Sequence, residues 1–299
     1  MIPLYRKISV QIDITNACKL NCAHCNRLVG HHKKSYFMDV DTVAKSIESL
    51  DGFPGTIGII GGDPTIHPDF IEICKLMKKM VPRKKRQIAT AGYKWEEYKE
   101  IIYQTFEKDH VQYNNHSENK EVFHQPLLLA GEDILEDREL MWRLIGNCWM
   151  QWRWCSSITP KGGYMCEPAG AMDILFDGET GYPIEKGWWN KETEQFVDQV
   201  KRFCPKCSIP IPLPKYDCNK EVCLISKSNA ERLKKVESPR FMKGKTVTIN
   251  IKYTESDIQK FVDQGWAPWH FRNFAQHNPE EKKMYKEWEG MSNFTVELQ

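Results

Sequence analysis

Three cysteines that follow a predicted strand constrain this chain more than any other feature of its sequence. They are Cys18, Cys22 and Cys25, and the strand is predicted over residues 8–14, where isoleucine and valine alternate with polar residues. Three thiolates on one short loop can hold three irons of a [4Fe–4S] cube and leave the fourth iron open to a small molecule. The alternative is structural zinc, which usually takes four ligands and paired Cys-x2-Cys spacings. The spacing favours the cube.

Strand and helix patterns alternate through the first half of the chain. Hydrophobic periodicity after the cysteine loop predicts a helix over 40–50, a strand over 56–60, a helix over 68–80, a strand over 87–90, a helix over 95–107 and a strand over 111–114. This alternation predicts an α/β fold with a parallel sheet and helices outside it. Active sites of such folds lie at the carboxyl ends of the strands, which is where the cysteine loop falls.

A second motif, Gly61-Gly62-Asp63-Pro64, ends the second predicted strand. Two adjacent glycines allow the backbone to approach a ligand closely, because no Cβ stands in the way. Taken alone, the motif is also compatible with an ordinary turn from strand to helix.

The cysteine triplet and this glycine motif together resemble the radical S-adenosylmethionine (SAM) superfamily. The resemblance implies a partial (β/α)6 TIM-type barrel, a [4Fe–4S] cluster on Cys18, Cys22 and Cys25, and SAM bound to the open iron through its amino and carboxylate groups. It implies further that an electron from the cluster cleaves SAM. The 5′-deoxyadenosyl radical so formed would take a hydrogen atom from substrate.

The same resemblance implies contacts to SAM from residues near the strand ends. His24 stands where the family usually carries an aromatic residue near the adenine, and Asp63 replaces the usual Glu. The implied SAM-binding residues are His24, Gly61, Gly62, Asp63, Pro64, Thr90, Gly92, Asn114 and Ser117. His116 is a candidate for facing the substrate, although a histidine in such a loop is more often a structural hydrogen bonder.

The chain has eleven cysteines, and a second group lies beyond residue 140. In a reducing compartment clustered cysteines indicate metal rather than disulfides. Cys148 and Cys166 flank a predicted hairpin over 158–164 that turns at Gly162-Gly163, and Cys204 and Cys207 form a Cys-x2-Cys pair. These four resemble the ligands of the twitch domain, a shortened SPASM domain that holds one auxiliary [4Fe–4S] cluster. Zinc is the alternative at this site, and a full SPASM domain with two clusters fits the cysteine order poorly.

These patterns predict a barrel core over 1–140, a twitch/SPASM-like domain over 141–223 and a C-terminal extension over 224–299. Cys155, Cys218 and Cys223 remain outside the predicted ligand sets. Each is a candidate hydrogen-atom donor to a substrate radical, and the alternatives are a spare core thiol or a cluster ligand.

Charge and hydropathy limit the classes of partner. The formal net charge is only +2, which does not indicate nucleic acid. We find neither a signal peptide nor an apolar run long enough to span a membrane, and therefore expect a cytoplasmic protein.

The predicted function is a radical SAM oxidoreductase or epimerase that acts on a sugar-like or cyclitol-like small molecule, with flavodoxin or ferredoxin as reductant. Trp188-Trp189 and the tryptophans of residues 266–269 are candidates for stacking on a sugar, although aromatic clusters are more often core. One alternative is a maturase of ribosomally made peptides, which is less favoured because the first strand begins by residue 8 and leaves no room for a leader-binding region before the barrel. The other is a non-catalytic metal-binding protein.

Overall fold

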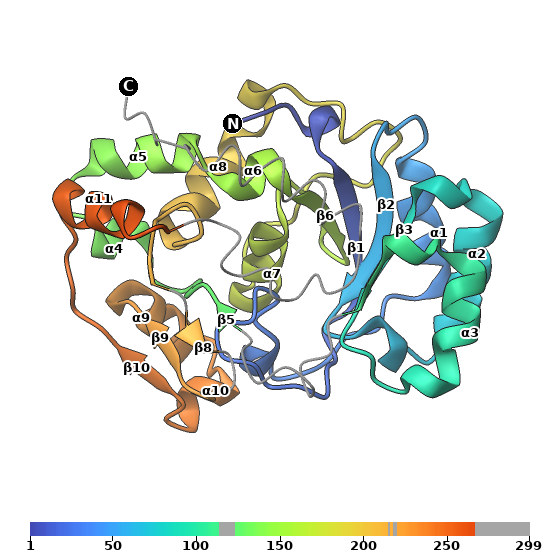
Figure 1. Ribbon diagram of the computed structural model, residues 1–299, viewed down its shortest axis with the longest axis horizontal. Coiled ribbons are helices and arrows are strands. Elements are labelled where there is room, and N and C mark those ends of the chain that lie inside the picture. Colours follow the sequence, from blue (N-terminus) through green and yellow to red (C-terminus); the bar gives the residue numbers. More distant parts are fainter. Residues whose placement is uncertain (114–122, 215, 218–219, 267–299) are drawn as a thin grey trace.

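A six-stranded sheet forms the centre of the computed structural model, which describes residues 1–113, 123–214, 216–217 and 220–266 (Figure 1). The strand order is β4-β3-β2-β1-β6-β7, and each neighbouring pair is parallel except β6 and β7. The strands are β1 (Ser9–Thr15), β2 (Thr56–Gly61), β3 (Arg86–Thr90), β4 (Val111–Tyr113), β6 (Cys155–Thr159) and β7 (Gly162–Tyr164). The predicted α/β class with a parallel, partial-barrel sheet is confirmed.

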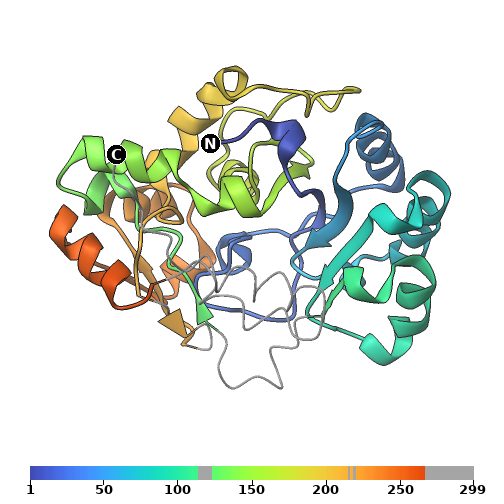
Figure 2. The same cartoon turned by 45° about the horizontal axis from the view of Figure 1, so that its top comes forward.

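Three helices follow the first three strands and pack on one side of the sheet (Figures 1 and 2). They are α1 (Val40–Ser49), α2 (Phe70–Met80) and α3 (Trp95–Thr105). The helix α1 begins where the Asp39 side chain accepts a hydrogen bond from the backbone N–H of Thr42. The predicted ends agree with the structure to within two residues, because the apolar positions repeat at helical spacing on each buried face.

Strand β1 is buried on both faces, which the sequence pattern did not predict. Val10, Ile12 and Ile14 are wholly buried as expected, whereas Ile8 precedes the strand and is 48% exposed. The alternate residues are polar and equally inaccessible, and they include Gln11 and Asp13. Buried polar groups need partners. The opposite face of β1 therefore belongs to a polar interior rather than to solvent.

The hairpin of β6 and β7 extends the barrel sheet. Its turn lies at Pro160 and Lys161, so the predicted turn at Gly162-Gly163 was wrong by two residues. Pro160 lacks the N–H that a sheet ladder needs, and it ends the strand. Strand β6 pairs in parallel with β1, from Ser9 opposite Cys155 to Ile12 opposite Ile158. The expected boundary near residue 140 consequently does not separate two sheets, although the three-part division itself stays a prediction.

The remaining elements form a second lobe on the side away from α1–α3 (Figures 1 and 2). Its helices are α4 (Gly131–Ile134), α5 (Arg138–Gly146), α6 (Trp149–Arg153), α7 (Glu167–Phe176), α8 (Val197–Phe203), α9 (Lys227–Lys235), α10 (Pro239–Met242) and α11 (Glu255–Asp263). Two short strand pairs complete it: β5 (Phe123–His124) with β8 (Tyr216–Asp217), and β9 (Cys223–Ile225) with β10 (Thr246–Thr248). Among the described residues, we find no helix with the length and apolarity that crossing a membrane requires.

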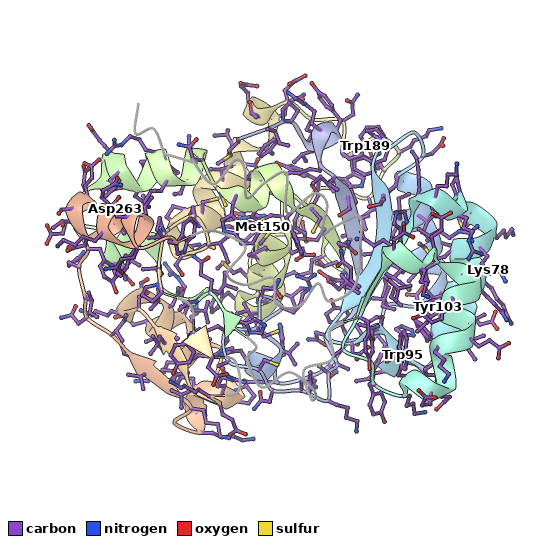
Figure 3. The ribbon with its side chains drawn as sticks, viewed as in Figure 1. Lys78, Trp95, Tyr103, Met150, Trp189 and Asp263 are labelled. Atoms are coloured by element: carbon purple, nitrogen blue, oxygen red, sulfur yellow. The ribbon has the colours of Figure 1, made fainter. Side chains whose placement is uncertain are left out.

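Trp188 and Trp189 lie at the amino ends of the strands, away from the cysteine loop, which does not suit the predicted stacking on a sugar. The ring of Trp189 packs edge-on against Phe53, and its indole N–H donates to the carbonyl oxygen of Ser49 at 3.2 Å. Ser49 ends α1 and Phe53 lies between α1 and β2, so Trp189 lies at the amino ends of the strands (Figure 3). Trp188 is buried in the core. The cysteine loop follows the opposite, carboxyl end of β1, so this pair serves as core.

Candidate active site and second cysteine cluster

The loop that leaves β1 carries Cys18, Cys22 and Cys25 as reduced thiols. Burial is the main reason that the pKa of Cys18 is raised to about 12, and the neighbouring Cys25, Asp63 and Cys22 contribute to that rise, so the three thiols lie within electrostatic reach of one another. The Cys18 sulfur accepts a hydrogen bond from the backbone N–H of Leu20 at 3.4 Å. Burial also raises the pKa of Cys25, and the backbone N–H groups of Val29 and Arg27 oppose that rise.

These features fit three cysteine ligands of an iron–sulfur cube. Backbone N–H groups directed at the sulfurs stabilise thiolates, which are the form that binds iron. Within the described ranges, no three His, Cys, Asp or Glu side chains converge as ligands of a single metal ion. The thiolates of a cube bind separate irons, so they need not converge on one point.

The glycine motif docks the end of β2 against the strand that leads into the cysteine loop. The backbone N–H of Gly62 donates to the Thr15 carbonyl oxygen at 2.8 Å, and that of Asp63 donates to Ala17 at 2.8 Å. A Cβ on Gly61 would lie 2.0 Å from the Thr15 oxygen, and one on Gly62 would lie 2.2 Å from the Ala17 oxygen. Both positions therefore require glycine because two chain segments touch there. Pro64 is buried beside them, and their contact with SAM stays a prediction.

Asp63 ties the ends of β2 and β3 together. Its carboxylate is 1% exposed and accepts hydrogen bonds from the hydroxyls of Thr90 at 2.7 Å and Thr65 at 2.9 Å. It also accepts from the backbone N–H groups of Thr65 at 3.1 Å and Tyr93 at 3.2 Å. Thr90 in turn accepts from the N–H of Gly92, which has a φ of +81°. The sequence predicted these residues as separate ligand contacts, and the structure joins them in one network.

His24 holds the cysteine loop against the second lobe. Its ring is buried and packs edge-on against Tyr216 with centroids 4.6 Å apart, and its Nε2 accepts from the N–H of Leu224 at 3.3 Å. Burial lowers the pKa of His24 to about 3, so the ring is neutral. The placement near adenine that the resemblance implies stays a prediction, since the described neighbours of this ring belong to β8 and β9.

Cys223, a predicted hydrogen donor, lies directly behind this loop. Its sulfur accepts from the N–H of His24 at 3.2 Å and from Arg240 Nη1 at 3.1 Å, and it lines one small cavity with Cys22 and Cys25. Arg240 also donates to the carbonyl oxygen of Asn21 at 2.7 Å. We call the segment 221–245 the clamp, because it fastens the cysteine loop from outside. No sequence pattern indicated this contact, which spans about two hundred residues.

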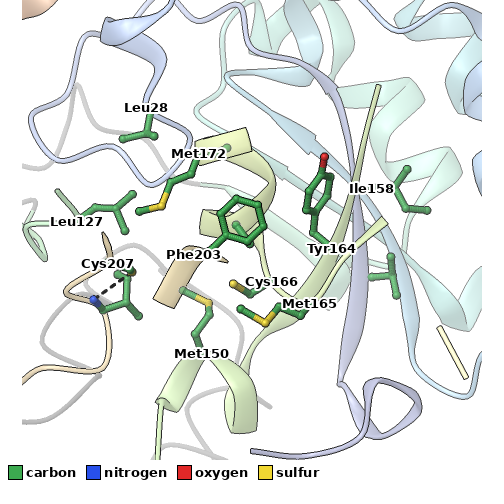
Figure 4. Packing of buried hydrophobic residues seen from close by; sticks show 14 of the residues in the cluster. Leu28, Leu127, Met150, Ile158, Tyr164, Met165, Cys166, Met172, Phe203 and Cys207 are labelled. Atoms are coloured by element: carbon green, nitrogen blue, oxygen red, sulfur yellow. Dashed lines mark hydrogen bonds between the residues drawn. The ribbon is translucent and has the colours of Figure 1, made fainter. Parts of the chain in front are cut away.

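The second cysteine cluster gathers Cys148, Cys166, Cys204 and Cys207 from three separate segments. Burial raises the pKa of Cys204, and Cys166, Cys148 and Cys207 raise it further, which makes the four sulfurs electrostatic neighbours. Burial likewise raises the pKa of Cys166 to about 12. Figure 4 shows Cys166 and Cys207 within the packed core, near Met150 and Phe203. The predicted ligand set is thus brought together as reduced, largely buried thiols.

Backbone donors also reach this cluster. The N–H of Ile209 donates to the Cys207 sulfur at 3.4 Å. Burial raises the pKa of Cys148 and Cys166, and the N–H groups of Met150 and Ala169 respectively oppose that rise. The cysteine loop after β1 likewise has thiols whose pKa is raised by burial, a rise that backbone N–H groups oppose. Four such thiols fit a cube that is ligated on every iron.

A buried charge network that the sequence analysis missed joins the two cysteine groups. Arg27 lies 2.9 Å from Asp13 through Nε and 2.6 Å from Glu167 through Nη1. The Cys155 thiol donates to the other oxygen of Glu167 at 2.8 Å, and the Trp154 indole N–H donates to Glu167 at 3.0 Å. Burial raises the pKa of Asp13 to about 7 although Arg27 opposes the rise. The only signal in the sequence was that Arg27 and Glu167 follow closely after Cys25 and Cys166.

Four predicted site residues lie outside the residues that the structure describes: Asn114, His116, Ser117 and Cys218. Their roles in binding SAM, facing the substrate or donating hydrogen stay predictions.

Comparison with known proteins finds similarity over the part of the chain that contains Cys18, Cys22 and Cys25. Residues 12–127 match the family model described as the radical SAM superfamily. A stretch of 76 residues, 24% of this chain, is 34% identical to the 7,8-dihydro-6-hydroxymethylpterin dimethyltransferase of Methanocaldococcus jannaschii. That stretch spans only 15% of the relative's length.

Solved structures with similarity to the chain share little sequence with it. BtrN in complex with AdoMet and 2-DOIA is 14% identical with a TM-score of 0.43, and the match covers 67% of this chain and 88% of BtrN. Tagged anSMEcpe with bound AdoMet is 14% identical with a TM-score of 0.25, and the match covers 86% of this chain and 58% of that one.

Proposed function

We propose, from the premise that this chain belongs to the radical SAM superfamily, that it oxidises a carbohydrate-like small molecule, and that Cys148, Cys166, Cys204 and Cys207 hold an auxiliary [4Fe–4S] cluster. Family membership implies SAM and a [4Fe–4S] cluster, for which Cys18, Cys22 and Cys25 are the ligands we propose. When bound, they supply a 5′-deoxyadenosyl radical that removes a hydrogen atom from substrate. The observation that carries the proposal of oxidation is the second cysteine cluster: four reduced thiols assembled in the interior from three segments.

Oxidation of an alcohol to a ketone removes two hydrogens from the substrate. One leaves as the abstracted hydrogen atom, and the other leaves as a proton and an electron. The electron needs an acceptor near the substrate, and a second cluster provides one. Epimerisation needs instead a thiol that can give hydrogen back. The described candidates are both engaged, since the Cys155 thiol donates a hydrogen bond to Glu167 and the Cys223 sulfur accepts two hydrogen bonds. This contrast favours oxidation over epimerisation.

The polar interior beside β1 supports a hydroxyl-rich substrate. Apart from the atoms of the Asp13–Arg27 ion pair, two buried polar atoms of Gln11 and Arg27 have no hydrogen-bond partner among the described residues: the acceptor Oε1 and the donor Nη2, respectively. Buried polar groups are normally satisfied, so a ligand that offers hydroxyl groups to such atoms suits this interior. A sugar or cyclitol has that chemistry, and we propose this substrate class on that ground.

The test is anaerobic reconstitution with iron and sulfide, followed by incubation with SAM, dithionite and a panel of aminocyclitols and sugars. We expect about eight irons per chain, 5′-deoxyadenosine, and a product lighter by two hydrogens. A product whose mass is unchanged in H2O and that incorporates one deuterium in D2O would replace oxidation with epimerisation. Zinc without iron, together with intact SAM, would overturn the proposal.

A further inference from the structure

A buried lysine is held by α6, the helix that begins directly after Cys148. Lys7 is 2% exposed, and its ammonium group donates to both the carbonyl oxygen and the Oε1 of Gln151, each at 2.7 Å. Gln151 belongs to α6, which begins directly after Cys148, and its own N–H bonds back to the Cys148 carbonyl oxygen at 2.9 Å. The ammonium is therefore fixed in place by the same short helix that presents a predicted cluster ligand.

The lysine is an electrostatic neighbour of three of the four thiols. Its positive charge opposes the rise that burial causes in the pKa of Cys148, Cys166 and Cys204. These thiols in turn oppose the fall that burial causes in the pKa of Lys7. Gln151 occupies two hydrogen-bond positions of an ammonium that has three donors. Burying a lysine ammonium removes it from water, which is costly unless an anion lies beside it. Neither Gln151 oxygen carries a charge. With the thiols protonated, the described surroundings thus leave this cation incompletely compensated.

A cube held by four thiolates supplies the missing anion. Such a cluster carries net negative charge, which becomes more negative by one unit on reduction. A fixed cation in a low-dielectric interior stabilises the reduced form more than the oxidised form, since the Coulomb energy grows with the charge of the partner. A nearby cation therefore raises the reduction potential and makes the cluster a better electron acceptor.

We propose that Lys7 is a positioning residue that tunes the second cluster to accept the substrate's electron. The inference rests on the proposed auxiliary cluster and adds to it the residue that sets its redox behaviour. It assigns a role to a lysine that lies just before β1, outside both cysteine motifs.

The experiment isolates the second cluster by replacing Cys18, Cys22 and Cys25 with alanine, and then compares Lys7→Gln, Lys7→Arg and Lys161→Met. Glutamine can still donate to Gln151 but has no charge, whereas arginine keeps the charge. Lys161 is the matched control, because it lies in the β6–β7 turn and pairs with Asp177 at 3.0 Å. Iron content and the midpoint potential, followed by electron paramagnetic resonance during a redox titration, are the readouts.

We expect about four irons in this background. At a fixed potential, Lys7→Gln should lower the ratio of reduced to oxidised cluster by tenfold or more, which is about 59 mV for one electron. Lys7→Arg and Lys161→Met should stay near the parent value. An unchanged potential in Lys7→Gln at full iron content would overturn the role of Lys7 and leave the auxiliary cluster standing. Absence of iron from the parent background would instead remove the auxiliary cluster itself.

Loss of iron from Lys7→Gln is also informative. If Lys7→Arg keeps its iron, the positive charge is needed to hold the cluster, which supports the proposed interaction. If Lys7→Arg loses iron as well while circular dichroism shows a folded chain, charge is not what matters at this position, and the proposal fails.

Discussion

The two cysteine groups of this protein are assembled in opposite ways. The first lies on one loop between β1 and α1, so three thiols are held together by eight consecutive residues, 18–25. The second takes one cysteine from before α6, one from before α7 and two from a turn after α8. Closing a long loop has an entropic cost that only a folded lobe can offset. The first group is thus a local motif, whereas the second exists only once the chain has folded.

The difference extends to what surrounds each group. The first is fastened from outside by the clamp, through Arg240 and Cys223. The second has three thiols in the core, with Cys204 partly buried against it, and a buried lysine as an electrostatic neighbour. A loop that ends in an open iron must remain accessible to a ligand, whereas a cluster ligated on every iron need not. The accessible first group and the largely buried second group agree with those two roles.

The largest effect that this comparison predicts is the loss of SAM cleavage when Cys18, Cys22 and Cys25 are replaced by alanine together. Without these thiolates no open iron remains to bind SAM. 5′-Deoxyadenosine formation with dithionite is the measurement, and we expect it to fall to the background level. Cleavage at the parent rate would mean that the first group is not the SAM site.

Replacement of Cys204 and Cys207 by alanine is the converse test. We expect the loss of about four irons per chain, since two thiolates cannot hold a cube, while slow SAM cleavage without substrate persists. Iron analysis and the deoxyadenosine assay on one preparation separate the two groups. Cys74→Ala is the control, because this thiol is buried in α2 among apolar neighbours. Unchanged iron in the double variant would show that the second group is only a thiol-rich core.

Locality also explains how much of the molecule could be predicted from its sequence. The strands β1 to β4, the helices α1 to α3 and the first cysteine group follow from periodicities and spacings within a few turns of chain. The pairing of β6 with β1, the network around Glu167 and the contact of Cys223 with His24 each join residues more than a hundred positions apart, and no local pattern specifies such a partner. Cys148, Cys166, Cys204 and Cys207 could be grouped only through the hairpin, the Cys-x2-Cys pair and the resemblance of their order to the twitch domain.

Replacement of Asp63 tests whether stability and SAM binding at the first cysteine group depend on the neighbouring ends of β2 and β3. Asp63→Ala leaves two threonine hydroxyls and two backbone N–H groups without their buried acceptor, which should cost about 2–4 kcal/mol of unfolding free energy. It should also raise the KM for SAM, because β2 and β3 are no longer tied together. Asp69→Ala is the matched control, since Asp69 is exposed and its side chain makes no cap hydrogen bond. Equal stability in both variants would contradict the role of the network.

The smallest expected effect concerns the clamp, through His31. Its ring is buried and bonded to the hydroxyl of Ser238 at 2.8 Å, and burial lowers its pKa to about 3 from 6.5. Because the folded state keeps this ring neutral, the unfolded state binds more protons below pH 6.5. The stability that His31 contributes is therefore fully present above pH 6.5 and is lost as the pH falls. Between pH 6.5 and 5.5 the loss from this group should be about 1 kcal/mol.

His31→Asn should remove that part of the pH dependence while lowering stability at pH 7 by about 1 kcal/mol, through the lost bond to Ser238. Urea unfolding followed by tryptophan fluorescence at several pH values measures both effects. His110→Asn is the control, since this partly buried histidine bonds to the Arg86 carbonyl oxygen at the far edge of the sheet, away from the clamp. If His31→Asn keeps the parent slope, the clamp does not hold its histidine neutral.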